Sequence, residues 1–178
     1  VDGGLGFSVD LKSAEGSLVG YQAKPHTGII DLDNVNSYKR FQEGSFAPTT
    51  AAWGLDNRTA GFRLAGHGNS IRIECRVPGA DVNPYLAFSG LILAGLYGIE
   101  NNLKLEDPLK GNIYQNKKAK IVPGTLREAI EIAKKSKLLP KIFLPDVLEH
   151  YIHSAQWEQS EYDKSVNDWE HKRYFERG

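Results

Sequence analysis

The chain has 178 residues, of which 40% are hydrophobic and 25% are charged, so it fits one folded domain and is too apolar for a disordered protein. Its 22 basic and 22 acidic residues cancel, which argues against a general nucleic-acid or anionic-membrane binder, because such binding depends on surplus positive charge. A single cysteine, Cys75, excludes an intrachain disulfide and a cysteine-cluster zinc site and predicts a reducing compartment, by default the cytoplasm.

Residues 1–34 are rich in glycine and turn formers, and the one strand expected there is Gly6–Leu11, where apolar and polar residues alternate. Short β segments follow between residues 47 and 77. We predict them at Thr49–Trp53, Thr59–Ala65 and Ser70–Val77, with Gly66-His67-Gly68-Asn69 as a hairpin turn between the last two.

Helices dominate the rest of the chain. Asn83 has the character of an N-cap, with Pro84 at the first helical position, and this helix should end near Asn101-Asn102. Its apolar residues run almost all round, so we expect it to be buried. Its apolar stretch is too short for a membrane span.

A long loop is expected over Leu103–Pro123, because Asp-Pro, Gly-Asn and Pro-Gly pairs punctuate it. Thr125 and Glu128 form a capping-box pair that predicts a helix to about Leu139. Pro145 precedes one or two amphipathic helices over Asp146–Arg177. Their predicted inner face carries Leu148, Tyr151, Ile152, Ala155, Tyr162, Val166 and Trp169, and Trp157 and Tyr174 are also spaced like packing residues.

The segment Ser70–Val77 is the most informative part of the chain. On a strand, Arg72, Glu74 and Arg76 share one face while the apolar residues between them face the core. A hairpin that turns at His67-Gly68 would place Arg63 opposite Arg72 and leave open space above Glu74.

Arg40 and Arg58 lie in loop-like contexts that could converge on the same face. Arginine binds carboxylate and phosphate, whereas magnesium requires carboxylate oxygens. The pattern alone therefore fits either an anion site with one acid or a solvated sheet face held by ion pairs, and it does not choose between them.

Several motifs in order resemble the C-terminal half of the glutamine synthetase catalytic domain. They are Asn36-Ser-Tyr-Lys-Arg40, Gly44-Ser-Phe-Ala-Pro48, Trp53-Gly-Leu-Asp-Asn-Arg-Thr-Ala60, Arg72-Ile-Glu-Cys-Arg-Val-Pro-Gly-Ala-Asp-Val-Asn-Pro-Tyr-Leu-Ala87 and Gly95-Leu-Tyr-Gly-Ile-Glu100. The tail, Asp168-Trp-Glu-His-Lys-Arg-Tyr-Phe-Glu176, is similar to the branch that makes γ-glutamyl amides. This resemblance covers residues 36–178.

The resemblance implies an α+β fold in which an antiparallel sheet forms the floor of an active site and helices pack against it. It also implies an ATP-dependent ligase that phosphorylates the γ-carboxylate of glutamate and transfers the acyl group to an amine, with Mg²⁺ or Mn²⁺. By position, Arg40 and Arg76 would bind glutamate, Arg58 and Arg63 would stabilise the transferring phosphoryl group, Arg72 and Arg63 would flank the nucleotide, and Glu74 would bind metal.

Two departures from the family pattern matter. Phe46 stands where ammonia-using members have a glutamate that helps to bind and deprotonate ammonium, which favours a bulkier amine. The family's N-terminal β domain and carboxylate strand have no counterpart in this sequence, and one glutamate cannot fill a magnesium shell. Residues 1–35 are expected to be a degenerate or replaced segment, in which Ser8 and Asp10 stand where a similar family strand has histidines.

Three functions stay open from the sequence. The chain is part of a γ-glutamyl amide ligase, completed by an upstream region or by a partner subunit in a homo-oligomer, or it is a degenerate relative with a structural, regulatory or binding role. The third is a self-standing binder of nucleotide or glutamate that uses these arginines. Four other polar residues are weaker candidates for a functional site. His67 sits in a turn, His150 and His153 are most simply a surface pair, and Tyr114 lies in a loop where some family members carry a regulatory modified tyrosine.

Overall fold

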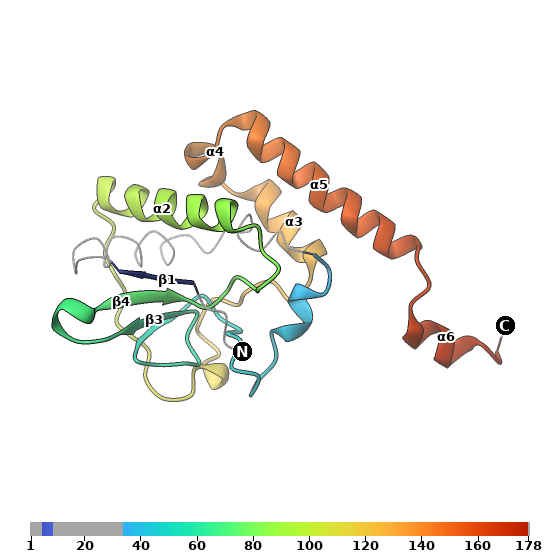
Figure 1. The fold of residues 1–178 in the computed structure, drawn as a ribbon, viewed down its shortest axis with the longest axis horizontal. Coiled ribbons are helices and arrows are strands. Elements are labelled where there is room, and N and C mark those ends of the chain that lie inside the picture. The colour runs from blue at the N-terminus through green and yellow to red at the C-terminus, as the bar shows by residue number, and fades with distance from the viewer. Residues whose placement is uncertain (1–4, 9–33, 178) are drawn as a thin grey trace.

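A computed structural model describes residues 5–8 and 34–177. The strands are β1 (Leu5–Ser8), β2 (Trp53–Leu55), β3 (Phe62–Ala65) and β4 (Arg72–Cys75). The α-helices are α2 (Pro84–Glu100), α3 (Leu126–Lys135), α4 (Leu139–Ile142), α5 (Pro145–Lys164) and α6 (Asp168–Tyr174), and short 3-10 helices are η1 (Ser37–Arg40), η2 (Gly68–Ser70) and η3 (Ile113–Gln115). Helices pack over a small sheet, so the predicted α+β class is confirmed (Figure 1).

The strands form one sheet in the order β1-β4-β3-β2. β4 is antiparallel to both of its neighbours, but β2 and β3 are parallel, so the sheet is mixed instead of wholly antiparallel. The strand predicted at Thr49–Trp53 is wrong except for its last residue. Thr50 instead forms an isolated bridge with Ile121, a partner from the long loop that local sequence patterns do not reveal.

The hairpin between β3 and β4 has a different register from the predicted one. Its turn contains η2, and Gly66 and Gly68 take positive φ angles of 92° and 53°. The longer turn shifts the pairing by two residues, so Arg63 lies opposite Glu74 and Ala65 lies opposite Arg72. A shift of two preserves the faces of the strands, so the predicted inward and outward sides of β4 are retained.

The main core lies between the sheet and the helices. Ile73 and Cys75 point inward from β4 and join a cluster that includes Leu91 of α2 and Leu148 of α5. In Figure 1, α2 lies above the strands, and α5 slants from the top of the molecule down to the right, beyond α3. The alternation predicted for β4 is therefore confirmed, and it leaves the opposite face of the sheet for the charged residues.

Helix α2 has the predicted start, because the Asn83 side chain accepts from the backbone N–H groups of Tyr85 and Leu86. The expectation that this helix is buried all round is wrong. Small residues such as Ala87 and Gly90 are buried against the body, whereas Tyr85, Ile92, Leu96 and Ile99 are exposed within the described ranges. None of the described helices is long and apolar enough to span a bilayer.

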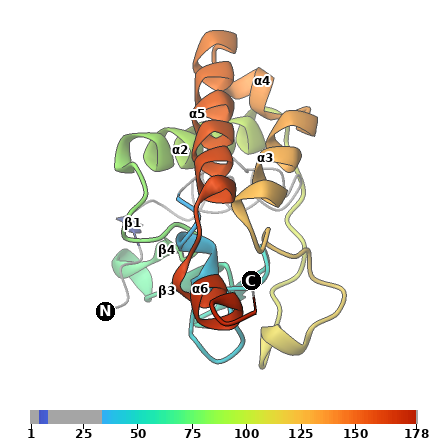
Figure 2. The ribbon, with the colours of Figure 1, turned by 90° about the vertical axis from the view of Figure 1, so that its right-hand side faces the viewer.

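Four C-terminal helices, α3 to α6, stand where two or three were predicted, and the additional one is α4. The helix predicted to reach Leu139 ends at Lys135, because the Ser136 hydroxyl accepts from Leu138 and Leu139 N–H groups and starts a new turn. α5 buries Leu148 and Ala155 as predicted. No residue of α6 is buried, and it lies apart from the other helices (Figures 1 and 2), so the inward placement of Trp169 and Tyr174 is wrong. Trp157 of α5 and Val166, between α5 and α6, are also exposed, so their inward placement is wrong as well.

Candidate active site

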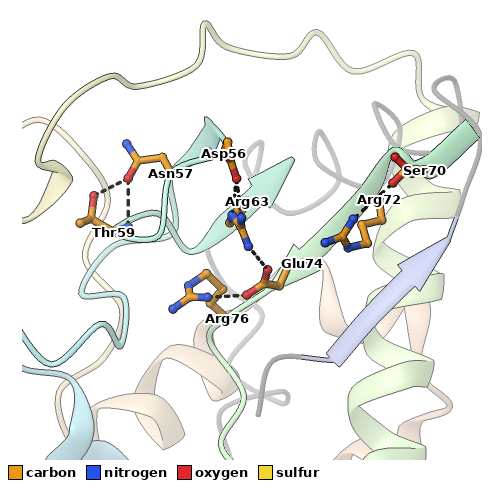
Figure 3. Close-up of polar contacts among 8 residues, drawn as sticks. All are labelled: Asp56, Asn57, Thr59, Arg63, Ser70, Arg72, Glu74 and Arg76. Atoms are coloured by element: carbon orange, nitrogen blue, oxygen red, sulfur yellow. Dashed lines mark hydrogen bonds and ion pairs between the residues drawn. The ribbon is translucent and has the colours of Figure 1, made fainter. Parts of the chain in front are cut away.

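Three of the predicted site residues form a continuous ion-paired row on the sheet face away from the core. Arg63 of β3 donates from Nη1 to Glu74 Oε2 at 2.8 Å, and Arg76 donates from Nη1 to Glu74 Oε1 (Figure 3). The Arg76 side chain is only 2% exposed, and those of Arg63 and Glu74 are 15% and 16% exposed. The open space predicted above Glu74 is therefore wrong, because the actual register places a guanidinium there.

Asp56 extends this row, and the sequence analysis missed it. It directly follows β2 and accepts from both Nε and Nη2 of Arg63. The hydrogen bond and charge of Arg63 lower the pKa of Asp56, and the same hydrogen bond raises the pKa of Arg63. The available signal was the Asp56-Asn-Arg-Thr turn, in which the Asn57 side chain accepts from the N–H and hydroxyl of Thr59.

The remaining arginines surround the row without joining it. Arg58 is exposed in the turn after Asp56, and its charge contributes to the lowered pKa of that carboxyl. Arg72 is exposed at the other end of β4, where it donates to the Ser70 carbonyl at 3.4 Å. Within residues 34–177 neither Arg58 nor Arg72 forms an ion pair.

Arg40 approaches the row from its far end. It donates from Nη2 to the carbonyl of Val77, the residue after Arg76, and its guanidinium lies 4.5 Å from the ring centroid of Phe41. Arg40 ends η1, which the Ser37 hydroxyl anchors to Asp81 at 2.6 Å. The structure thus brings Arg40, Arg63, Glu74 and Arg76 into one connected region.

Asp81 is a support that sequence reasoning missed. Its carboxylate accepts from Ser37 and from the side chain of Asn34, which fixes η1 against the loop after β4. Partial burial is the largest single influence and raises the pKa of Asp81, but the hydrogen bonds from Ser37 and Asn34 and the charge of Arg40 together outweigh it, so the pKa is lowered.

The Gly44–Pro48 loop borders the same region. Arg76 donates from Nη2 to the Phe46 carbonyl at 2.9 Å, so this loop and Glu74 share one guanidinium. The Phe46 side chain is 58% exposed. The backbone of Phe46 therefore contacts the buried end of the charged row, and its exposed side chain has no group that can exchange a proton.

The described residues do not fit a complete metal centre. No group of three or more histidine, cysteine, aspartate or glutamate side chains that could hold an ion occurs among them. Both oxygens of Glu74 already accept from arginines. His67, His150 and His153 are exposed, and none belongs to such a group. Asp10 and the predicted domain segment 1–35, apart from β1 and Asn34-Val35, lie outside the described residues.

The comparison with known families matches the catalytic domain of glutamine synthetase over residues 23–174. The chain belongs to this family. Among curated relatives, it is 54% identical over 149 residues to a γ-glutamylethanolamide synthetase of Streptomyces coelicolor, covering 84% of the chain and 32% of that protein. It is 42% identical over 150 residues to a glutamate–isopropylamine ligase of a Pseudomonas species, covering 83% and 33%.

The fold agrees with this assignment. A solved complex of GmaS with ADP superimposes with a TM-score of 0.77 and 27% identity, covering 92% of this chain and 40% of that one. The chain spans about a third of the length of the two curated relatives named above. The predicted resemblance to γ-glutamyl amine ligases is therefore confirmed over the residues that these relatives match.

Proposed function

We propose that this chain forms part of an ATP-dependent ligase that joins the γ-carboxylate of glutamate to an amine larger than ammonia. The observation that supports it best is the ion-paired row Arg63–Glu74–Arg76, flanked by the exposed Arg58 and Arg72 and bordered by Phe46. Internal pairing fixes the row, and the flanking arginines add the positive charge that an anionic substrate needs. The proposal takes its substrate class from the relatives, which are synthetases of γ-glutamyl amides.

Each arginine then has a proposed role. Arg40 and Arg76 bind glutamate or its acyl phosphate, Arg58 and Arg63 neutralise the transferring phosphoryl group, and Arg72 with Arg63 flanks the nucleotide. Phosphoryl transfer depends on positioning and charge neutralisation, which guanidinium groups supply. A glutamate γ-carboxylate oxygen attacks the terminal phosphorus of ATP and ADP leaves. The amine nitrogen then attacks the acyl carbon and phosphate leaves.

For the metal, the described residues offer one proposed ligand. Glu74 is proposed as a ligand of Mg²⁺ or Mn²⁺, and further oxygen ligands must come from outside the described residues, from more of the polypeptide or a neighbouring subunit of a homo-oligomer.

Phe46 supports the choice of amine. Ammonium must lose a proton before its nitrogen can attack, and a phenyl ring cannot accept that proton, whereas an apolar ring can pack against the carbon atoms of a larger amine. The relatives named above act with ethanolamine and isopropylamine by name. We therefore expect the complete polypeptide that carries this sequence to form γ-glutamyl amides from such amines faster than glutamine from ammonium. The cytoplasm stays the predicted compartment, on the single-cysteine argument.

Binding measurements on Arg58→Ala and Arg72→Ala test the phosphate assignment directly. Both side chains are exposed and form no ion pair with a described residue, so the variants should fold normally. Each should weaken Mg-ATP binding about tenfold or more, the contribution of one charged hydrogen bond, in calorimetric titration with and without glutamate. Arg127→Ala on α3 is the matched control, because Arg127 pairs only with the exposed Asp163 among described residues.

A degenerate, non-catalytic relative is the second candidate, favoured by one observation: both Glu74 oxygens are held by arginines in the absence of a metal-ligand cluster among the described residues. It predicts no ATP binding at millimolar concentration and no amide product from any amine. Binding that strengthens with glutamate would contradict this alternative and support the ligase.

A further inference from the structure

The Gly44–Pro48 loop is held by two side chains that come from distant parts of the chain. Arg76, from the end of β4, donates to the Phe46 carbonyl at 2.9 Å. Tyr114, from η3 in the long loop, donates its hydroxyl to the next carbonyl, that of Ala47, also at 2.9 Å. The Arg76 contact holds the peptide plane between Phe46 and Ala47, and the Tyr114 contact holds the next plane, between Ala47 and Pro48. Together they restrain the backbone that follows Phe46, and so they restrict the direction in which its ring can leave the backbone.

The conformation that these donors hold is an unusual one. Phe46 has a φ of 59°, in the left-handed region that a bulky residue rarely adopts. Such a conformation persists only where the surroundings determine it. The loop immediately after Phe46 enters the core, since Ala47 is 8% exposed and Pro48 is fully buried. The Phe46 side chain is 58% exposed, so packing restrains it only in part and the backbone conformation contributes to its position.

Tyr114 is well placed to act as a fixed anchor. Its neighbour Ile113 is 1% exposed, and the Ile113 N–H donates to the Thr59 hydroxyl at 3.0 Å. Thr59 belongs to the turn that carries Arg58. The hydroxyl of Tyr114 therefore connects the loop proposed to face the amine with the turn proposed to face the phosphoryl group.

We propose that Tyr114 is a positioning residue for amine selection: its hydroxyl holds the Ala47 carbonyl, which orients Phe46 and thereby sets the size of amine that the site accepts. The amine part of this inference rests on the proposed function. The loop-holding part stands on the Tyr114–Ala47 contact alone. Tyr114 touches neither glutamate nor ATP in this scheme, so its removal should affect the amine selectively.

The test is Tyr114→Phe in the complete polypeptide, which removes the hydroxyl and leaves the ring. Hydrogen–deuterium exchange of the amides from Gly44 to Ala47 should become faster. KM for isopropylamine should rise about 2- to 10-fold, the effect of one neutral hydrogen bond, while KM for ATP and glutamate stay unchanged. Tyr85→Phe is the matched control, because Tyr85 is 82% exposed on α2 and lies outside the site.

A double-mutant cycle separates positioning from a general structural effect. If Tyr114 acts through Phe46, Tyr114→Phe should add nothing to the amine KM in a Phe46→Ala background. A full effect in that background, or equal rises in the KM of all three substrates, would overturn the inference. Unchanged exchange in the loop would overturn it even in an inactive protein. Faster exchange without any ligase activity in the parent would refute the proposed function and leave Tyr114 as the anchor of the loop.

Discussion

At the scale of single residues, Glu74 determines how the charged row holds together. It is the only carboxylate among the described residues that bridges two arginines, and one of them, Arg76, is almost completely buried. A buried guanidinium without a negative partner is costly because it has lost its hydration. Glu74 is therefore important for stability as well as for the proposed chemistry.

We predict that Glu74→Gln lowers the free energy of unfolding by about 2–3 kcal/mol, because the charge that compensates Arg76 and Arg63 is lost while the side chain keeps its shape. Urea unfolding followed by tryptophan fluorescence measures this change. Asp163→Asn removes the exposed partner of Arg127 and is the control, for which we expect little change. Equal losses in the two variants would contradict the role given to Glu74.

At the scale of elements, the turn between β3 and β4 decides which residues meet across the hairpin. Gly66 and Gly68 both have positive φ, but their surroundings differ. A Cβ added at Gly66 would lie 2.2 Å from the Ser70 carbonyl oxygen, whereas one at Gly68 would meet nothing within 4 Å. Glycine is thus needed at position 66 both for its positive φ and because a side chain would overlap Ser70. At position 68 it is needed only for its positive φ.

Substitution by alanine at these two positions should separate the two effects. Gly68→Ala is expected to cost about 1 kcal/mol, the strain of a left-handed residue. Gly66→Ala should cost clearly more, because the added methyl group overlaps the backbone of Ser70. The difference in unfolding free energy between the variants is the measurement, and Gly68→Ala is the control. Equal costs would mean that the turn relaxes and that close approach does not fix the register.

At the scale of the whole molecule, carboxylates dominate the response to acid. Asp56, Asp81, Glu131 and Asp163 all have lowered pKa values. For three of them a hydrogen bond from a basic side chain is the main cause, and for Asp81 several hydrogen bonds outweigh burial. A carboxyl with a lower pKa in the folded state than in the unfolded state stabilises the fold above the unfolded value. This contribution is lost as the pH falls through the folded value.

We therefore expect the contribution of these four carboxyls to the free energy of unfolding to be constant from neutral pH to about pH 5. Below about pH 4 this contribution should decline, because the carboxyls of the unfolded chain then take up protons. Urea midpoints between pH 7 and pH 3 measure the decline. Asp81→Asn should lower stability at neutral pH and make the decline shallower. Asp107→Asn is the control, because Asp107 is exposed and forms no ion pair with a described residue. An unchanged slope in Asp81→Asn would refute this assignment.

The long loop at residues 103–123 shows why part of the site escaped prediction. Its turn-forming pairs correctly identified it as a loop. Its anchors are contacts to residues far away in the sequence, such as the Trp53 indole to the Glu106 carbonyl and Tyr114 to Ala47. Periodicity and turn signals describe neighbours along the chain, so they cannot report such pairs. The same limit explains why Asp56 and Asp81 were missed.

The sequence by itself determined the family, the α+β class, the start of α2 at Asn83 and the face of β4 that carries Arg72, Glu74 and Arg76. These follow from residue order and from the two-residue period of a strand, and a register shift of two residues leaves the faces of the strand unchanged. Only the tertiary structure decided that Glu74 lies between Arg63 and Arg76, that Asp56 joins them, and that Tyr114 holds the loop of Phe46. Those contacts depend on the length of one turn and on where distant loops meet the sheet, and no local pattern encodes either.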